Sequence, residues 1–139
     1  MRSLLVTSLI AMVAATPILA QTCEIDIDAV DARIADLERN YSGVLSDIGC
    51  DAPTIPAHQI MCDASDQPNA QLWRMGRLDT LAWVYAVENA TGQQVDQENP
   101  PLDEDFIARR DACTDAACLC DVLISHTNDS LGGTSPYPQ

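Results

Sequence analysis

Apolar residues recur at alternating steps of three and four between residues 27 and 48, which is the spacing of an amphipathic helix. Acidic side chains occupy the opposite face, and Gly49 and Cys50 follow the last apolar position. The pattern predicts a helix over this whole segment. Its apolar side packs either against a second copy of the chain, as in a coiled coil, or inside one small bundle, which the short length favours. The row consists of Ile27, Val30, Ile34, Leu37, Tyr41, Val44 and Ile48.

A second apolar stripe predicts a long helix from about Asn69 to Asn89, stopped by Gly92. The segment before it, 50–68, contains three prolines and predicts irregular backbone with at most one helical turn over 57–61.

Two shorter helices are expected after a polar linker. Asp103 can cap a helix that runs through Arg110, and a last helix is predicted over 116–131, ended by two glycines. The tail over 132–139 is expected to be disordered. No segment has a convincing strand pattern, so the expected fold is an all-α bundle of three or four helices, a single domain over 21–131.

The first twenty residues have the pattern of a secretory signal peptide. Arg2 precedes a twelve-residue run from Leu4 to Ala15 of apolar, small or hydroxyl side chains, shorter than the roughly 20 apolar residues of a spanning helix. Cleavage is expected near Ala20, with a cut after Ala15 as an alternative. A buried N-terminal helix is the competing interpretation. Export to the periplasm or the medium is preferred, and it leaves 119 of the 139 residues.

The charge balance is strongly acidic. Seven basic residues, all arginine, stand against 21 acidic ones, for a formal net charge of -14, and loss of Arg2 with the signal peptide makes it -15. Scattered arginines at this net charge make a nucleic-acid partner improbable, because binding phosphate needs clustered basic side chains. The same charge favours a basic protein as partner.

All six cysteines follow the signal segment, and an even number in an exported chain predicts three disulfides. Cys118 and Cys120 are two residues apart, so their side chains point to opposite sides and a mutual bridge would be strained. The predicted pairs are Cys50–Cys62, Cys113–Cys118 and, by elimination, Cys23–Cys120.

Two metal sites compete with this interpretation. Cys113, Cys118, Cys120 and His126 could bind zinc, but they lack a Cys-x-x-Cys pair, and an oxidising compartment removes the thiolates that such a site needs. His58 beside Met61 could bind copper but is one ligand short. We therefore expect no metal and no cofactor.

Two stretches, IGCDAPTIPAHQIMC and DFIARRDACTDAACLC, resemble the family of small exported domains typified by the LprI-type lysozyme inhibitors. The resemblance covers about 48–131. The chain differs from the family at several substituted positions. It also has two additional cysteines, Cys23 and Cys120, which supports pairing them with each other. The matching positions are Cys50, Cys62, Leu78, Asp79, Tyr85, Phe106, Arg110, Asp111, Cys113, Cys118 and Leu119. Phe106 keeps the aromatic character of its position but replaces the usual Trp, and the other substituted positions are His58, Asp103 and Leu123.

Catalysis is not expected, because no nucleophile motif or phosphate-binding glycine loop is present. The resemblance implies an exported binding protein that occludes the cleft of a basic protein such as a lysozyme. The stiff segment from Cys50 to Cys62 is the expected contact, through Asp51, His58 and Gln59. The alternative function is an envelope structural or assembly module that pairs through the helix over 27–48 and inhibits nothing.

Overall fold

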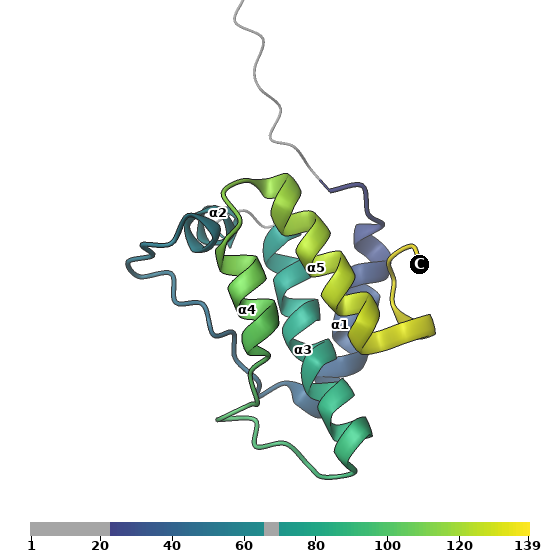
Figure 1. Cartoon of the computed structure of the whole chain (residues 1–139). Helices are drawn as coiled ribbons and strands as arrows, with labels where there is room; N and C mark the ends of the chain where they lie inside the picture. The colour runs from purple at the N-terminus through teal and green to yellow at the C-terminus, as the bar shows by residue number, and fades with distance from the viewer. Residues whose placement is uncertain (1–22, 66–69) are drawn as a thin grey trace, which may run out of the picture.

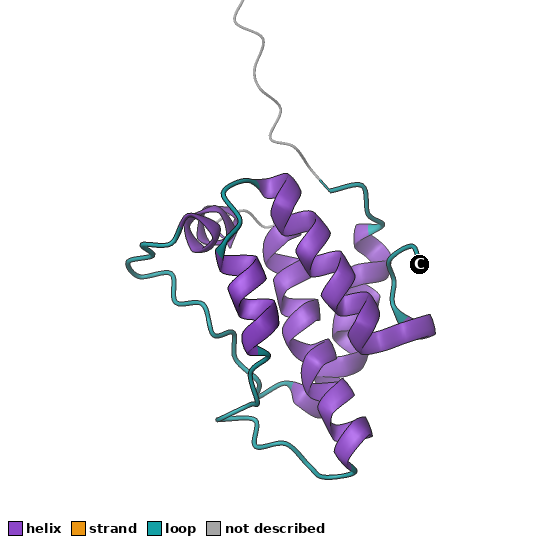
Figure 2. Ribbon diagram, in the orientation of Figure 1, coloured by secondary structure: helices purple, strands orange, loops and turns teal. Residues whose placement is uncertain are grey.

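The computed structural model describes residues 23–65 and 70–139. The expected signal peptide over 1–20 lies outside these residues. The described chain is all-α, as predicted, with five α-helices and three disulfides (Figures 1 and 2). The elements are α1 (Ile27–Tyr41), α2 (Pro56–Ser65), α3 (Gln71–Thr91), α4 (Glu104–Asp111), α5 (Ala116–Leu131) and the short 3-10 helix η1 (Gly132–Thr134).

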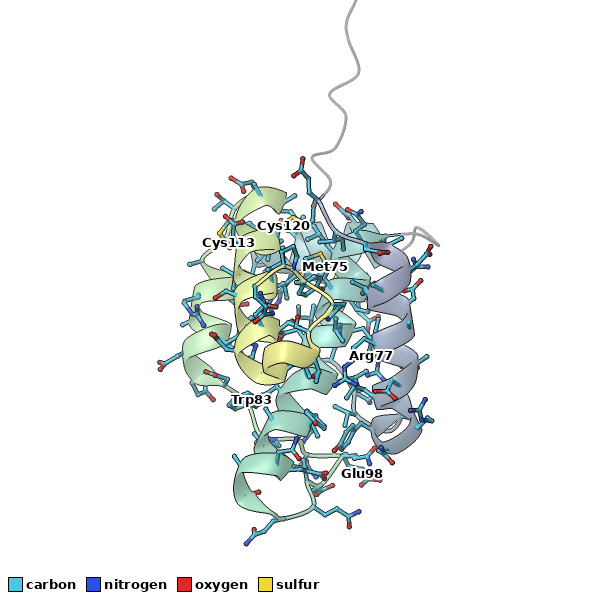
Figure 3. The ribbon with its side chains drawn as sticks, turned by 90° about the vertical axis from the view of Figure 1, so that its right-hand side faces the viewer. Met75, Arg77, Trp83, Glu98, Cys113 and Cys120 are labelled. Atoms are coloured by element: carbon cyan, nitrogen blue, oxygen red, sulfur yellow. A yellow bond between two sulfur atoms is a disulfide. The ribbon has the colours of Figure 1, made fainter. Side chains whose placement is uncertain are left out.

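Helix α3 is the centre of the bundle. It packs against α5, α1 and α2, while α4 lies against α5 and α2 (Figure 1). Figure 3 shows Met75 inside this arrangement, where it is fully buried. Further core side chains with an exposed fraction of 1% or less are Val30, Val44, Ala57, Leu78, Leu81, Ala82, Val84, Cys113, Leu119 and Leu123.

The helix ends follow local capping signals. Asp26, Asp103 and Asp115 each accept a hydrogen bond from a backbone N–H in the first turn of α1, α4 and α5. Helix α3 ends at Gly92, which adopts a left-handed φ of 66° and donates its N–H to the carbonyl of Glu88.

The prediction of one helix from 27 to 48 is wrong, because α1 ends at Tyr41. The side chain of Gln97 accepts a hydrogen bond from the Gly43 N–H at 3.0 Å and donates one to the Asn40 carbonyl at 2.8 Å. These are backbone groups that a continuing helix would pair internally. Val44 nevertheless is fully buried. The apolar pattern therefore indicated a buried residue correctly, although the helix has already ended there.

The apolar row of α1 packs within the chain. Val30, Leu37 and Tyr41 are buried, and Ile27 and Ile34 contact the same core. Helix α3 is the neighbour of α1. The row is thus packed inside one small bundle, which is the alternative that its short length favoured.

The segment 56–65 forms ten residues of helix, where a single turn at most was expected. Pro56 occupies the first position, where its missing N–H has no helical partner to lose and its fixed φ suits the helix. The helix buries Ala57 and Met61 against the bundle.

The prediction of a disordered tail is also wrong. Residues after α5 form η1 and turn back along the bundle (Figure 1). Tyr137 is only 3% exposed, and Asn128 donates a hydrogen bond to the Pro138 carbonyl. Burial of one aromatic ring and these contacts fix a segment whose composition suggested disorder.

The three disulfides are the pairs expected from the sequence, with Cα–Cα distances of 5.7 Å for Cys23–Cys120, 5.4 Å for Cys50–Cys62 and 5.5 Å for Cys113–Cys118. They join the residues before α1 to α5, the 42–55 loop to α2, and the loop after α4 to α5. No helix among the described residues has the length and apolar character needed to cross a bilayer.

Candidate functional site

Two loops meet below the N-terminal end of α4 and form the mouth of a pocket. They are 42–55, between α1 and α2, and 92–103, between α3 and α4 (Figure 1). The cavity is small, about 40 Å³. Its apolar walls are Leu45, Trp83, Val84, Pro100, Pro101, Leu102, Phe106 and Ile107, and its polar lining consists of Asp47, Asp79, Thr80, Asp103, Arg110 and His126.

The rim of this pocket carries two exposed leucines, one from each loop. Leu45 is 75% exposed and Leu102 is 52% exposed, and they are the large hydrophobic residues that the described chain leaves exposed. Trp83 holds the second loop in place, since its indole N–H donates to the Pro101 carbonyl at 3.0 Å. The pocket therefore has an apolar rim on a fixed backbone.

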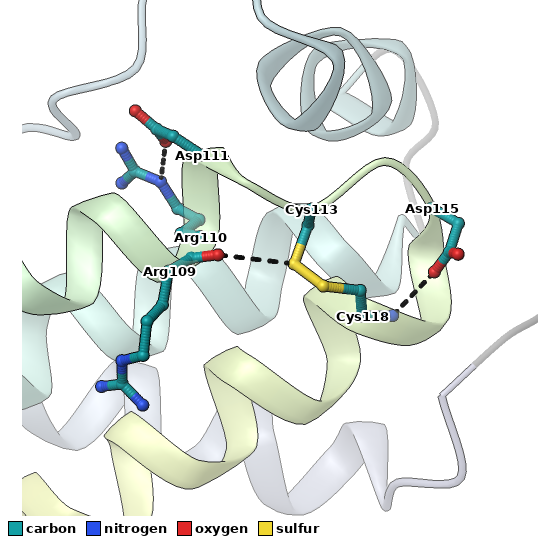
Figure 4. Close-up of a disulfide and its surroundings, with 6 residues drawn as sticks. All are labelled: Arg109, Arg110, Asp111, Cys113, Asp115 and Cys118. Atoms are coloured by element: carbon teal, nitrogen blue, oxygen red, sulfur yellow. Dashed lines mark hydrogen bonds and ion pairs between the residues drawn. A yellow bond between two sulfur atoms is a disulfide. The ribbon is translucent and has the colours of Figure 1, made fainter.

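Arg110 forms the first of two ionic groups in the floor. Its guanidinium donates to both carboxylate oxygens of Asp47, at 2.9 and 2.7 Å, and its Nε donates to Asp111 at 2.9 Å. Figure 4 shows Arg110 directed toward Asp111 while the neighbouring Arg109 points away. Arg110 is only 3% exposed. A bidentate pair of this kind fixes geometry as well as charge, so it anchors the 42–55 loop to α4.

His126 is the centre of the second ionic group. Its Nδ1 lies 2.8 Å from Asp79 Oδ1 and its Nε2 lies 3.3 Å from Asp103 Oδ2. Thr127 donates its hydroxyl to the same Asp79 oxygen at 3.0 Å. The imidazole stacks on Phe106 with ring centroids 4.0 Å apart. This group joins α3, α5 and the capping residue of α4.

The environment of His126 favours its charged form. Burial alone would lower its pKa, but the carboxylates of Asp79 and Asp103 more than offset burial, and the pKa of His126 is raised above 6.5. Burial also raises the pKa of Asp79, against the opposing effect of His126 and Thr127. With a carboxylate on each ring nitrogen, His126 cannot exchange a proton with a bound molecule unless it releases one of them. The arrangement suits a rigid support for the pocket.

The structure separates the three residues expected to contact a partner. Asp51 and Gln59 are exposed, and the Gln59 side chain donates to the Pro53 carbonyl at 3.0 Å. His58 lies within the Arg110 group instead, with Nε2 2.9 Å from Asp111 Oδ1 and its side chain 17% exposed. His58 therefore belongs to α2, which turns its ring toward Asp111 of α4, and is not a residue of the preceding loop.

The cysteines of the suggested zinc site are bonded to one another or to Cys23. Cys113 Sγ, which carries no hydrogen, lies 3.7 Å from the Arg109 carbonyl oxygen, and Asp115 accepts from the Cys118 N–H (Figure 4). Within the described ranges, no group of three or more His, Cys, Asp or Glu side chains is arranged to hold a metal ion.

Sequence reasoning did not assign the pocket. One signal was present: Asp79 interrupts the apolar stripe of its helix and becomes 3% exposed, and a buried carboxylate needs partners. Neither the identity of its partner, His126, nor the exposure of Leu45 could be inferred, because each depends on how distant segments pack.

Comparison of the chain with protein-family models, with curated proteins and with solved structures found no match.

Proposed function

We propose that this protein is an exported binding protein for a basic protein partner, with a lysozyme as the first candidate. The observation that carries the proposal is the distribution of charge. Within the described ranges, five of the six arginines form ion pairs with carboxylates of the same chain. Asp79 and Asp103 face His126, and most of the other acidic side chains that the structure describes are exposed and form no ion pair.

An uncompensated negative field of this kind speeds the encounter with basic proteins and repels acidic ones. The three disulfides support the second element of the proposal, a rigid binding surface, because a surface ordered before binding loses less entropy when it binds. Disulfides are also typical of exported proteins, which agrees with the signal-like segment over 1–20.

The resemblance to the LprI-type lysozyme inhibitors supports a lysozyme as the partner and occlusion of the substrate cleft as the mechanism. Lysozymes of the animal type are basic, so this resemblance and the charge lead to the same class of partner. The buried ionic groups support the pocket and take no part in chemistry under this proposal.

The test is direct binding of the disulfide-intact protein to an animal-type lysozyme by calorimetry, at low and at physiological ionic strength, alongside a cell-wall hydrolysis assay. We expect saturable binding that weakens with salt, and inhibition at the same concentrations. An acidic protein of similar size is the control and should not bind. If no basic muramidase in a panel binds at low ionic strength, the proposal is overturned.

A further inference from the structure

We propose that the partner docks on the face formed by Leu45 and Leu102, and not on the segment from Cys50 to Cys62. We call this the two-leucine face: the two leucines, the pocket between them, and the acidic side chains of 92–105. The inference rests on the proposed function and specifies its site.

The first argument is exposure. Leu45 and Leu102 come from separate loops, yet both line the same pocket, and each leaves more than half of its surface in water. Leu45 also borders a second hollow of about 180 Å³, with Trp73 and Arg77 in its wall. Exposed apolar side chains grouped around hollows mark interaction surfaces, whereas single scattered ones do not.

The second argument is rigidity. The 42–55 loop is held by the Arg110–Asp47 pair, by the hydrogen bond from Arg77 to the Val44 carbonyl, and by the Cys50–Cys62 disulfide. The 92–103 loop is held by Gln97 and Trp83, and the residue after Leu102 caps α4. Both leucines are therefore presented on ordered backbone, which reduces the entropy lost on binding.

The third argument is charge, and it identifies the occupant. Between Gly92 and Ala108 the chain has five carboxylates and no basic residue: Asp96, Glu98, Asp103, Glu104 and Asp105. The positive groups of the floor, Arg110 and His126, already face Asp47, Asp79 and Asp103. Asp103 thus faces a cation, whereas Asp96, Glu98, Glu104 and Asp105 have no ion pair among the described residues. An apolar centre bordered by these four carboxylates is complementary to a protein that presents an apolar side chain flanked by lysine or arginine.

The size of the pocket agrees with a protein partner. A cavity of about 40 Å³ accepts the tip of one side chain, whereas pockets for small molecules are usually several hundred Å³. The expected contact is thus an anchoring side chain in the pocket with cationic neighbours over the acidic loop.

The experiment compares substitutions in the intact protein with the same animal-type lysozyme as probe. Leu45→Ser and Leu102→Ser should each weaken binding about tenfold, because central apolar residues dominate interface affinity. Both side chains are exposed, so the fold should persist, and thermal unfolding checks this. Leu45→Gln and Leu102→Gln repeat the measurement with side chains of similar length. Asp51→Ala with Gln59→Ala, in the other segment, should leave the affinity unchanged.

A second pair of variants isolates the charge. Glu98→Gln with Glu104→Gln should slow association and reduce its salt dependence. Asp121→Asn with Asp129→Asn removes the same net charge from exposed positions of α5 and is the matched control. The control should change association much less.

The possible failures are distinguishable. If the unmodified protein binds but the leucine variants bind equally well, while Asp51→Ala with Gln59→Ala weakens binding, the inference is wrong and the proposed function stands. If the leucine variants abolish a concentration-dependent dimer of the protein alone, the face pairs with a second copy, and the inference is overturned. If no basic protein binds the unmodified chain, the proposed function itself fails.

Discussion

His126 lies 2.8 Å from Asp79 across the interface between α5 and α3, and the other ring nitrogen faces Asp103 at the start of α4. Both residues of the pair are almost fully buried. Arg110 of α4 acts in the same direction as His126 and lowers the pKa of Asp79, against the burial that raises it. Burial and the nearby Asp79 in turn raise the pKa of Tyr137, so its hydroxyl stays neutral. The two ring nitrogens of His126 therefore connect α5 to α3 and to the start of α4.

The free energy of unfolding should decrease as pH rises above about 6.5. The pKa of His126 in the folded protein is raised above its ordinary 6.5, so its stabilising charge is fully present below that pH and lost as pH rises through the folded-state pKa. Urea unfolding at a series of pH values measures this. In His126→Gln the alkaline decrease should be smaller, and an unchanged profile would show that His126 is neutral in the fold.

At acid pH, the free energy of unfolding should decrease as pH falls. The Phe106 N–H, and the charge of His126, lower the pKa of Asp103 below its ordinary 3.8. Its contribution is present above that pH and lost as pH falls through the folded-state pKa. Maximal stability is expected between these two limits, and Asp103→Asn should reduce the acid slope.

Arg110 and Arg109 are adjacent in sequence but should respond differently to substitution. Arg110→Ala removes the buried guanidinium that pairs with Asp47 and Asp111. Since both carboxylates are partly exposed and His58 still faces Asp111, we expect a loss of about 3 kcal/mol in the free energy of unfolding, the lower end for a broken buried pair. Arg110→Lys keeps the charge but loses the bidentate geometry, for an intermediate loss. Arg109→Ala, at an exposed position, should change stability by about 0.5 kcal/mol or less. Equal effects at both positions would contradict the role of Arg110 as an anchor.

The three disulfides should differ in their stabilising effect. The Cys23–Cys120 bridge spans 97 residues and the Cys113–Cys118 bridge spans 5. On the chain-entropy model, replacing both cysteines by alanine should cost about 4.7 kcal/mol for the long loop and about 2 kcal/mol for the short one. Chemical denaturation of the two double variants tests the order. A larger loss for Cys113 and Cys118 would show that local geometry outweighs chain entropy here.

Two substitutions of Tyr137 separate the contribution of its ring to stability from that of its hydroxyl. Its ring is buried, so Tyr137→Ala should lower the free energy of unfolding by about 3 kcal/mol. The hydroxyl is buried without a hydrogen-bond partner among the described residues. Tyr137→Phe should therefore leave stability unchanged or raise it by about 1 kcal/mol. Thermal unfolding of both variants is the measurement, and a strong loss in Tyr137→Phe would reveal a partner for the hydroxyl.

Local signals explain why much of the fold was predictable. The long helix was expected over 69–89 and lies at Gln71–Thr91, and the last helix has the predicted bounds. Asp103 and Gly92 act as the cap and stop that their chemistry indicated. The disulfide pairs also agree with the prediction, which excluded a strained bridge between Cys118 and Cys120, preferred the two short loops and paired the remaining cysteines.

The errors occur where a distant segment supplies the deciding contact. Helix α1 ends early because Gln97, more than fifty residues away in sequence, takes its last hydrogen bonds. The tail is ordered because the core accommodates Tyr137. His58 turns inward because Asp111 and Arg110 lie opposite α2.

The sequence by itself determined the helical class, the capped helix ends, the cysteine pairs and the acidic excess, since each depends on neighbouring residues or on composition. Only the tertiary structure decided that Asp79 meets His126, that Arg110 anchors the 42–55 loop, and that Leu45 and Leu102 border one pocket. The physical reason is that a buried charge needs a partner, and the packing of distant segments decides which residue lies next to it. The periodicity of apolar residues contains no information about those distant contacts.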